Sequence, residues 1–352
     1  MNEIEHFLSS PDTPIREVMD SLGKNMGVSL IVDSEKRLLG TVTDGDIRRA
    51  ILSNVNLELP VEFLLNIERA PEHSSPITAK IETPTTVLLQ MMTEHNVRHI
   101  PIIDSDSRVQ DIAILEKLVK DYEMPLTAVV MAGGLGTRLR PLTEDLPKPM
   151  LPLGDRPLLE HIVNQLRTAG IRRLNITTHY KADMIEEYFK DGSSFGINIE
   201  YVDEKEPLGT AGALSLIDKP NEPLLVINGD IVTHVNLQAM LNFHNEQQAK
   251  MTVGVRLYEE TIPFGVIELD GTRITRVTEK PTNRHMINAG IYLIGQEAAA
   301  MVPTESRYDM TDLVGDLLTK GHRVVGFPIQ EYWRDIGKIE DYNKAQADAE
   351  EE

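Results

Sequence analysis

Residues 126 to 152 read LTAVVMAGGLGTRLRPLTEDLPKPMLP, and this stretch decides the fold of the part of the chain that follows. The apolar run from Ala128 to Ala132 predicts a buried strand. Gly133, Gly134 and Gly136 come directly after it. Glycine tolerates positive φ and has no Cβ, so such a loop lets backbone N–H groups converge on an anion. The stretch therefore predicts a strand that leads into a phosphate-binding loop.

The loop differs from two well-known glycine loops. No Gly-Lys-Ser/Thr sequence ends it, which argues against a P-loop. Gly134-x-Gly136 begins like a dinucleotide fingerprint, but Leu139 occupies the third small position and Arg140-Pro141 replaces a continuing helix. Taken alone, the glycines also fit an ordinary tight turn.

Length and composition predict a globular protein of two domains. The chain has 352 residues, 41% hydrophobic content and no cysteine, so it can bury sizeable cores without disulfides or thiolate metal sites. No apolar run approaches the roughly 20 residues of a membrane span. The stretch MNEIEHFLSSPDTP lacks a basic region followed by an apolar one, so we expect a cytoplasmic protein without a membrane partner. The net charge of −20 argues against a nucleic-acid partner.

Strand-like and helix-like segments alternate after the glycine loop. Residues 156–170, RPLLEHIVNQLRTAG, place apolar side chains on one helical stripe, and a strand-like segment from Ile171 to Thr178 follows. Such alternation implies right-handed crossovers and a mostly parallel sheet. Further along, Asp270-Gly271 lies between alternating segments and predicts a hairpin that extends the sheet as an antiparallel ribbon. We expect this domain to span residues 126–345, followed by a solvated acidic tail at 346–352.

The first 125 residues predict a separate α+β domain with an internal duplication. Residues 12–66 and 74–122 share a layout of helices and strands, and neither half could bury its apolar face well alone. The first half contains GTVTDGD, from Gly40 to Asp46; the second has no Thr/Ser-x-x-Asp at the corresponding place. Thr43 and Asp46 also suit a helix N-terminus.

Three stretches resemble known families. GGLGTRLRPLT followed by LPKPM resembles the signature of the sugar nucleotidyltransferases, or NDP-sugar pyrophosphorylases, and PLGTAGAL is similar to the GDP-mannose pyrophosphorylases among them. The duplicated N-terminal part resembles a tandem CBS pair, or Bateman module. The resemblance implies a Rossmann-like domain that joins an NTP, first of all GTP, to a sugar 1-phosphate and releases pyrophosphate, in a homo-oligomer. UTP, dTTP or CTP as the nucleotide, and a non-catalytic nucleotide sensor, remain alternatives.

The same resemblance implies roles for individual residues. In catalysis, Arg138 would hold the triphosphate and stabilise the leaving pyrophosphate, and Lys148 would neutralise both reacting phosphates. The nucleotide would contact Ala132, Gly133, Gly134, Gly136, Thr137, His179, Leu208, Gly209 and Thr210. The sugar phosphate would contact Gly265, Glu279, Lys280, Asn288 and Gly290. Thr43 and Asp46 would hold the ribose of an adenine nucleotide at the CBS module.

Two aspartates are candidates for a metal site. Asp230 ends the apolar run PLLVINGD, so it should emerge at the carboxyl end of the sheet, where open α/β sheets bind ligands. Asp335 follows another late strand. Carboxylates beside a triphosphate suit Mg²⁺, and the resemblance implies this catalytic use of both. A turn carboxylate for Asp230, and a salt bridge from Asp335 to Arg334, remain the alternatives.

Overall fold

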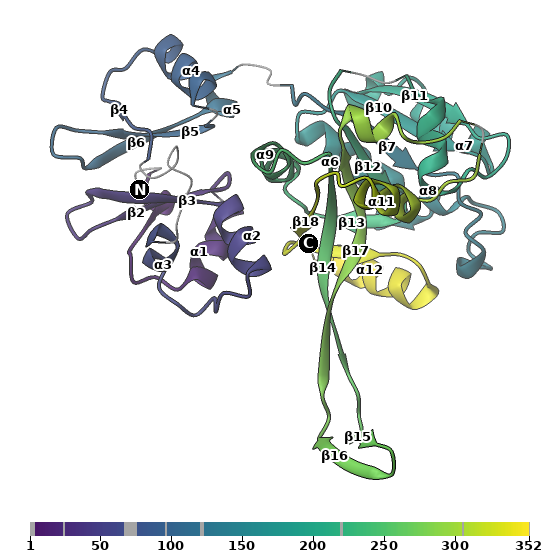
Figure 1. Cartoon of the computed structure of the whole chain (residues 1–352). Coiled ribbons are helices and arrows are strands. Elements are labelled where there is room, and N and C mark those ends of the chain that lie inside the picture. The colour runs from purple at the N-terminus through teal and green to yellow at the C-terminus, as the bar shows by residue number, and fades with distance from the viewer. Residues whose placement is uncertain are drawn as a thin grey trace. The chain divides into compact units, whose positions relative to one another are not determined.

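A computed structural model describes residues 4–23, 25–66, 76–95, 97–119, 123–218, 221–304 and 306–351. The chain divides into two compact units, Met1–Glu123 and Met124–Glu352, which are described separately (Figure 1). Two residues of the expected boundary, Asp121 and Tyr122, lie outside the described residues. Among the described helices, none has the length and hydropathy to cross a membrane.

The first unit contains two three-stranded sheets of one topology, which agrees with the expected duplication. In each sheet the first strand runs parallel to the second, and the second runs antiparallel to the third. Strands from both sheets share a buried apolar cluster that includes Leu30 and Ile114, so each half covers the other. The elements are η1 (Glu5–Phe7), β1 (Leu8–Ser9), α1 (Ile15–Leu22), β2 (Val28–Val32), β3 (Leu38–Thr43), α2 (Asp44–Leu52), α3 (Glu62–Asn66), β4 (Ala79–Lys80), α4 (Thr85–Glu94), β5 (His99–Ile103), β6 (Val109–Ile114) and α5 (Leu115–Leu118).

The second unit is organised around a seven-stranded sheet of order β11-β10-β7-β12-β17-β14-β18. Only β17 runs antiparallel to its neighbours in this sheet, so the expected α/β class with a mostly parallel sheet is confirmed. The strands are β7 (Thr127–Met131), β10 (Arg173–Thr178), β11 (Asn198–Asp203), β12 (Leu224–Asn228), β14 (Met251–Thr261), β17 (Thr282–Ile294) and β18 (Val324–Pro328).

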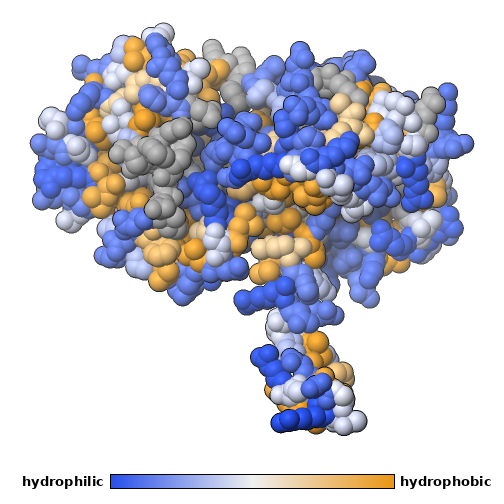
Figure 2. Space-filling model, viewed as in Figure 1, coloured by the Kyte–Doolittle hydropathy of each residue, from blue (hydrophilic) through white to orange (hydrophobic). Residues whose placement is uncertain are grey.

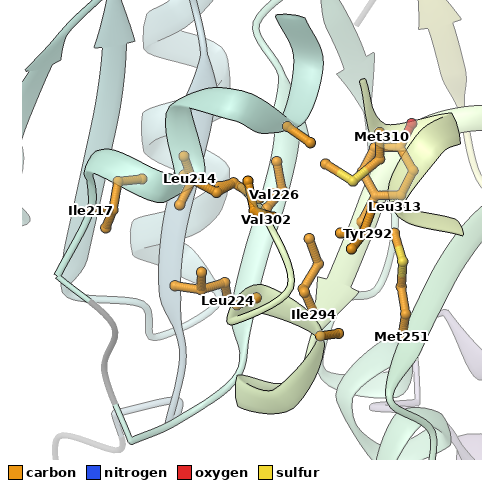
Figure 3. Close-up of a cluster of buried hydrophobic side chains, with 14 of the residues drawn as sticks. Leu214, Ile217, Leu224, Val226, Met251, Tyr292, Ile294, Val302, Met310 and Leu313 are labelled. Atoms are coloured by element: carbon orange, nitrogen blue, oxygen red, sulfur yellow. The ribbon is translucent and has the colours of Figure 1, made fainter. Parts of the chain in front are cut away.

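Helices cover this sheet and close its core. Strand β7 is central and apolar, and Val129 is fully buried. One core cluster joins β12, β14 and β17 to α8 and α11, with Leu224, Met251, Ile294 and Leu313 packed together (Figure 3). The helices of the unit are η3 (Thr137–Leu139), η4 (Lys148–Met150), α6 (Leu158–Thr168), α7 (Ala182–Phe189), η5 (Ser193–Phe195), α8 (Gly209–Gly212), η6 (Ala213–Leu216), α9 (Leu237–Glu246), α10 (Gln296–Ala299), α11 (Met310–Thr319) and α12 (Ile339–Glu351).

Strands β14 and β17 continue beyond the sheet as a two-stranded ribbon, as the sequence predicts. Their pairing runs from Val255 opposite Asn288 to Thr261 opposite Thr282. The hairpin of β15 (Val266–Asp270) and β16 (Arg273–Thr278) closes the ribbon, with Gly271 at φ 57° in the predicted turn. We call residues 256–287 the arm; it projects from the rest of its unit (Figure 1).

The acidic tail expected at residues 346–352 continues a helix in the structure. Helix α12 extends to Glu351, and Asp348 on it forms an ion pair of 2.8 Å with Arg334. Tyr342 and Gln346 on the same helix donate hydrogen bonds of 2.5 and 2.6 Å to the carbonyl oxygen of Pro152. An acidic composition suggests solvation, but here one carboxylate of the tail has a cationic partner on the body.

Candidate active site

A small two-stranded sheet brings the two predicted metal ligands together. Strands β13 (Ile231–Thr233) and β19 (Trp333–Asp335) pair antiparallel with Ile231 opposite Asp335. The N–H of Ile336 donates to the carbonyl oxygen of Asp230 at 3.0 Å. Asp230 and Asp335 are therefore neighbours, although a long stretch of sequence separates them. Arg334 pairs with Asp348, so the alternative of a salt bridge between Arg334 and Asp335 is not what the structure shows.

Two predicted cations lie beside these carboxylates. The Lys148 ammonium nitrogen lies 2.5 Å from Oδ2 of Asp230, and both side chains are largely buried. A Cβ placed on Gly337 would lie 3.5 Å from Oδ1 of Asp335 and 3.7 Å from Nη1 of Arg138, so these two groups flank one glycine. The four residues form what we call the charged cluster: Arg138, Lys148, Asp230 and Asp335.

The electrostatics of the charged cluster favour a bound cation. Burial, and then the charge of neighbouring Asp230, raise the pKa of the Asp335 carboxyl, while Lys148 and Arg138 act in the opposite direction. The ionised form of Asp335 is thus disfavoured by its surroundings, and more positive charge there would stabilise it.

The glycine loop packs against the charged cluster. Gly136 has φ 61°, and a Cβ there would lie 3.0 Å from Cγ2 of Thr143 and 3.3 Å from Cβ of Lys148. The Thr143 hydroxyl donates to the carbonyl oxygen of Gly136 at 2.8 Å. Gly136 is thus needed both for its backbone conformation and for the close approach of Lys148. Gly134 is exposed, a Cβ placed on it would meet no atom within 4 Å, and Thr137 begins η3.

The buried end of the loop meets His179 and an acidic residue that sequence reasoning missed. Ala132 is buried, and its N–H donates to Thr177. A Cβ on Gly133 would lie 2.8 Å from Oε1 of Glu204 and 3.4 Å from Cβ of His179. Nδ1 of His179 is 2.6 Å from the carbonyl oxygen of Glu204.

Glu204 also contacts Leu208, which belongs to the second stretch predicted to bind the nucleotide. Glu204 is only 5% exposed, and its Oε2 accepts the Leu208 N–H at 3.0 Å. The sequence did hold a signal for this residue, because acidic residues stand between a strand and the string PLGTAGAL. However, Asp203, Glu204 and Glu206 all fit that description. Burial alone distinguishes Glu204.

Gly209 and Thr210 are engaged by a segment far away in the sequence. The N–H of Thr210 donates to Oδ1 of Asp309 at 3.0 Å, and its hydroxyl accepts the Met310 N–H at 2.8 Å. A Cβ on Gly209, which has φ 81°, would lie 2.6 Å from the same Asp309 oxygen. Both residues contact the start of α11 in the structure. They therefore have a packing role in addition to the predicted contact with the nucleotide.

The structure separates the predicted sugar-phosphate residues into two groups. Asn288 and Gly290 lie in β17 at the sheet, where Oδ1 of Asn288 accepts the Gly290 N–H at 3.0 Å. A Cβ on Gly290 would lie 2.7 Å from Nδ2 of Asn228, two residues before Asp230. Gly265, Glu279 and Lys280 lie far along the arm and are not brought to the charged cluster.

In the first unit, Thr43 and Asp46 form a capping box at the start of α2. Asp46 Oδ2 accepts the Thr43 N–H at 2.8 Å, and the Asp46 N–H donates to the Thr43 hydroxyl. This is the helix N-terminal role that the sequence left open. Binding of an adenine nucleotide stays a prediction.

Comparisons with known proteins agree with this architecture. The family model described as nucleotidyl transferase matches residues 127–352, and the CBS domain model matches residues 10–53 and 72–120. The mannose-1-phosphate guanylyltransferase of Mycobacterium tuberculosis is 36% identical over 230 residues, which cover 63% of this chain and 64% of that protein. The mannose-1-phosphate guanyltransferase of Yarrowia lipolytica is 32% identical over 226 residues, 62% of each. The chain thus spans less than two thirds of the length of these relatives.

Two solved structures share the fold. A putative glucose-1-phosphate thymidylyltransferase from Bacillus anthracis, in complex with a sucrose, covers 64% of this chain and 95% of its own, with a TM-score of 0.52 and 24% identity. HddC from Yersinia pseudotuberculosis, complexed with GMP-PN, covers 64% of this chain and 99% of its own, with a TM-score of 0.50 and 24% identity. The nucleotidyl transferase model matches more than half of the chain and the CBS model matches both N-terminal repeats, so this chain belongs to the nucleotidyl transferase family and carries CBS domains.

Proposed function

We propose that the chain joins an NTP to a sugar 1-phosphate. An oxygen of the sugar phosphate attacks the α-phosphorus of the NTP, the bond from that phosphorus to the bridging oxygen breaks, and pyrophosphate leaves with its electron pair. The observation that carries the proposal is the charged cluster, in which Lys148, Arg138 and two carboxylates adjoin the glycine loop. Such a reaction needs no enzyme nucleophile, because positioning and charge neutralisation supply the catalysis.

The proposed roles of the cations follow from their positions. Lys148 lies next to the loop glycine Gly136 and to Asp230, so its ammonium group can neutralise the phosphates that react. Arg138 is exposed on the loop itself and can hold the leaving pyrophosphate. Ala132, Gly133, Gly134 and Thr137 would line the nucleotide.

We propose GTP and mannose 1-phosphate as the first substrates to test. The names of the relatives favour this pair. The string PLGTAGAL, which is similar to the GDP-mannose pyrophosphorylases, supports the same choice of base.

Mg²⁺ would be held by Asp230 and Asp335. No group of three His, Cys, Asp or Glu side chains in the described ranges is arranged to hold a metal, so phosphate oxygens and waters would complete the coordination. When bound, such an ion polarises phosphate oxygens and orients the two substrates. The two carboxylates fit this role, since extra positive charge relieves the repulsion between them.

The CBS domains would bind an adenine nucleotide at Thr43 and Asp46 and so regulate the reaction, in a cytoplasmic protein. Coupling of this kind is reciprocal: substrates should change the affinity for the adenine nucleotide by the same factor.

The test is a matrix of four NTPs against several hexose 1-phosphates, with pyrophosphate release as the signal. We expect the highest rate with GTP and mannose 1-phosphate, loss of activity in chelator, and recovery with Mg²⁺. Asp230→Asn and Asp335→Asn should fold normally and weaken Mg²⁺ binding by calorimetry. Glu340→Gln, which changes an exposed carboxylate on α12, serves as the control. No release with any pair would refute the enzyme and favour a nucleotide sensor.

A further inference from the structure

The hairpin at the end of the arm has one apolar face. In the register of β15 and β16, Ile267 lies opposite Val277 and Leu269 opposite Ile274. Ile267 and Leu269 alternate with Glu268 and so share a face. A β-bulge at Thr275 keeps their partners Val277 and Ile274 on that face, while the pair Asp270 and Arg273 belongs to the other. All four apolar side chains are more than half exposed.

Within the described residues of its own unit, 123–218, 221–304 and 306–351, nothing covers this face. Figure 2 shows hydrophobic residues on the projecting arm, at the bottom of the view, beside hydrophilic ones. Phe264, next to the hairpin, is 72% exposed. An isolated two-stranded hairpin is at best marginally stable in water, and needs a third strand or a packed face. An exposed apolar face of this kind marks an interaction surface.

With its strand pairing intact, the arm holds its end away from the body of its own unit (Figure 1). Beyond Val255 and Asn288 the ribbon pairs only with itself, in unbroken register to Thr261 and Thr282. The stretch from Asn288 to Thr282 spans about 20 Å at about 3.3 Å per residue of paired strand. Folding the arm back would require this ladder of hydrogen bonds to break or bend.

The site on the body lacks the groups that the arm carries. On the proposed function, the sugar phosphate needs Gly265, Glu279 and Lys280, yet the body contributes only Asn288 and Gly290 of that set. On the proposed roles, Lys148 serves the reacting phosphates and Arg138 the leaving pyrophosphate, so a further cation is needed to hold the sugar phosphate. The site is incomplete without an arm.

The body also presents apolar side chains close to this site. Leu135 lies in the glycine loop, Leu142 follows it, and Ile339 begins α12 just after Asp335; all three are exposed. All three lie within a few residues of a member of the charged cluster in the sequence, so apolar side chains are available near the site for an incoming apolar face.

We propose that the arm of one copy docks on the body of a second copy and supplies Glu279 and Lys280 to that copy's site. The inference rests on the proposed function for the role of these residues. A two-fold symmetric pair would exchange both arms, so that each site combines a body from one chain with an arm from the other. The partner is thus a second copy of this chain, and an arm that closes over its own site is the competing outcome.

The first test measures mass, not turnover. Wild type should sediment as a dimer or a multiple of one. The double variant Leu269→Asn, Ile274→Asn should dissociate at least ten-fold more readily, since it makes the apolar face polar. Its matched control, Asp270→Asn, Arg273→Asn, changes the directly neighbouring pair on the other face and should keep the wild-type assembly. A monomeric wild type, or equal behaviour of the two variants, would overturn the proposal.

The second test is complementation between two inactive chains. Asp230→Asn removes a carboxylate of the charged cluster from the body, and Lys280→Ala removes the cation that the arm would supply. In a mixed dimer with exchanged arms, one site joins the intact body to the intact arm, so random mixing should restore about a quarter of wild-type activity. No recovery in a mixture shown by mass to contain mixed dimers would mean that each arm serves its own body. If wild type itself released no pyrophosphate, the proposed function would fail, while the mass experiment would still decide the arm contact.

Discussion

Replacing Lys148 by alanine should affect turnover much more than stability. The change removes the cation that lies 2.5 Å from Asp230 and leaves that carboxylate beside Asp335. Arg138 stays near Asp335 and Asp230 keeps some exposure to water, so the loss of stability stays below that of a fully buried pair. The chemistry, by contrast, loses a charge aimed at the phosphates.

The expected losses of stability and of turnover differ in size. Breaking a fully buried ion pair costs about 3–5 kcal/mol, so we expect about 1–3 kcal/mol for this partly buried one. Loss of one preorganised charge in a transition state lowers the rate by roughly 10² to 10³. The double variant Lys148→Ala, Asp230→Asn should regain much of the lost stability, because it removes the uncompensated carboxylate, yet stay inactive.

The assays are urea unfolding for stability and pyrophosphate release at saturating substrates for turnover. Lys250→Ala is the matched control, because Lys250 forms an exposed ion pair with Glu297 at 2.8 Å, outside the charged cluster. It should change stability by less than about 1 kcal/mol and leave turnover unchanged. Near-full turnover in Lys148→Ala would refute the assigned role, and a double variant no more stable than the single one would refute the electrostatic reasoning.

Three further predictions concern separate parts of the chain. Gly136→Ala should lower both stability and turnover, whereas Gly154→Ala, at the same φ of 61° but with free space, should cost only about 1–2 kcal/mol of stability; equal turnover in the two would contradict the close packing at Lys148. Burial lowers the pKa of His244 to about 4 from 6.5. The unfolded chain therefore binds more protons between these values, and stability present above pH 6.5 is lost as pH falls toward 4. His244→Asn should remove this pH dependence, which amounts to up to about 3 kcal/mol of unfolding free energy between pH 6.5 and pH 4. Unfolding measured across this pH range would refute the prediction if the variant lost as much stability as wild type. Finally, Asp46→Asn in the full chain should weaken binding of AMP by calorimetry, and no binding to wild type would contradict a ligand role for the CBS domains.

Some features of the site were predictable because they depend on local backbone preference and hydrophobic period. The apolar run before Gly133 predicted a strand, and the structure has β7 there. The turn at Asp270-Gly271 follows from the need for positive φ at the glycine, which no long-range contact has to supply. The position of Asp230 after an apolar strand placed it at the carboxyl end of the sheet in the same way.

Other features depend on contacts between distant segments, which no single stretch contains. Antiparallel pairing of β13 with β19 decides that Asp335 meets Asp230, and burial decides that Glu204 rather than its acidic neighbours lies under the glycine loop. Asp348 forms an ion pair because the fold brings Arg334 within reach of it. The sequence by itself thus determined the strand, the glycine loop and the turn, because these are set by neighbouring residues. Only the tertiary structure decided which charges meet and where the arm carries Glu279 and Lys280, because register and packing act across the whole chain.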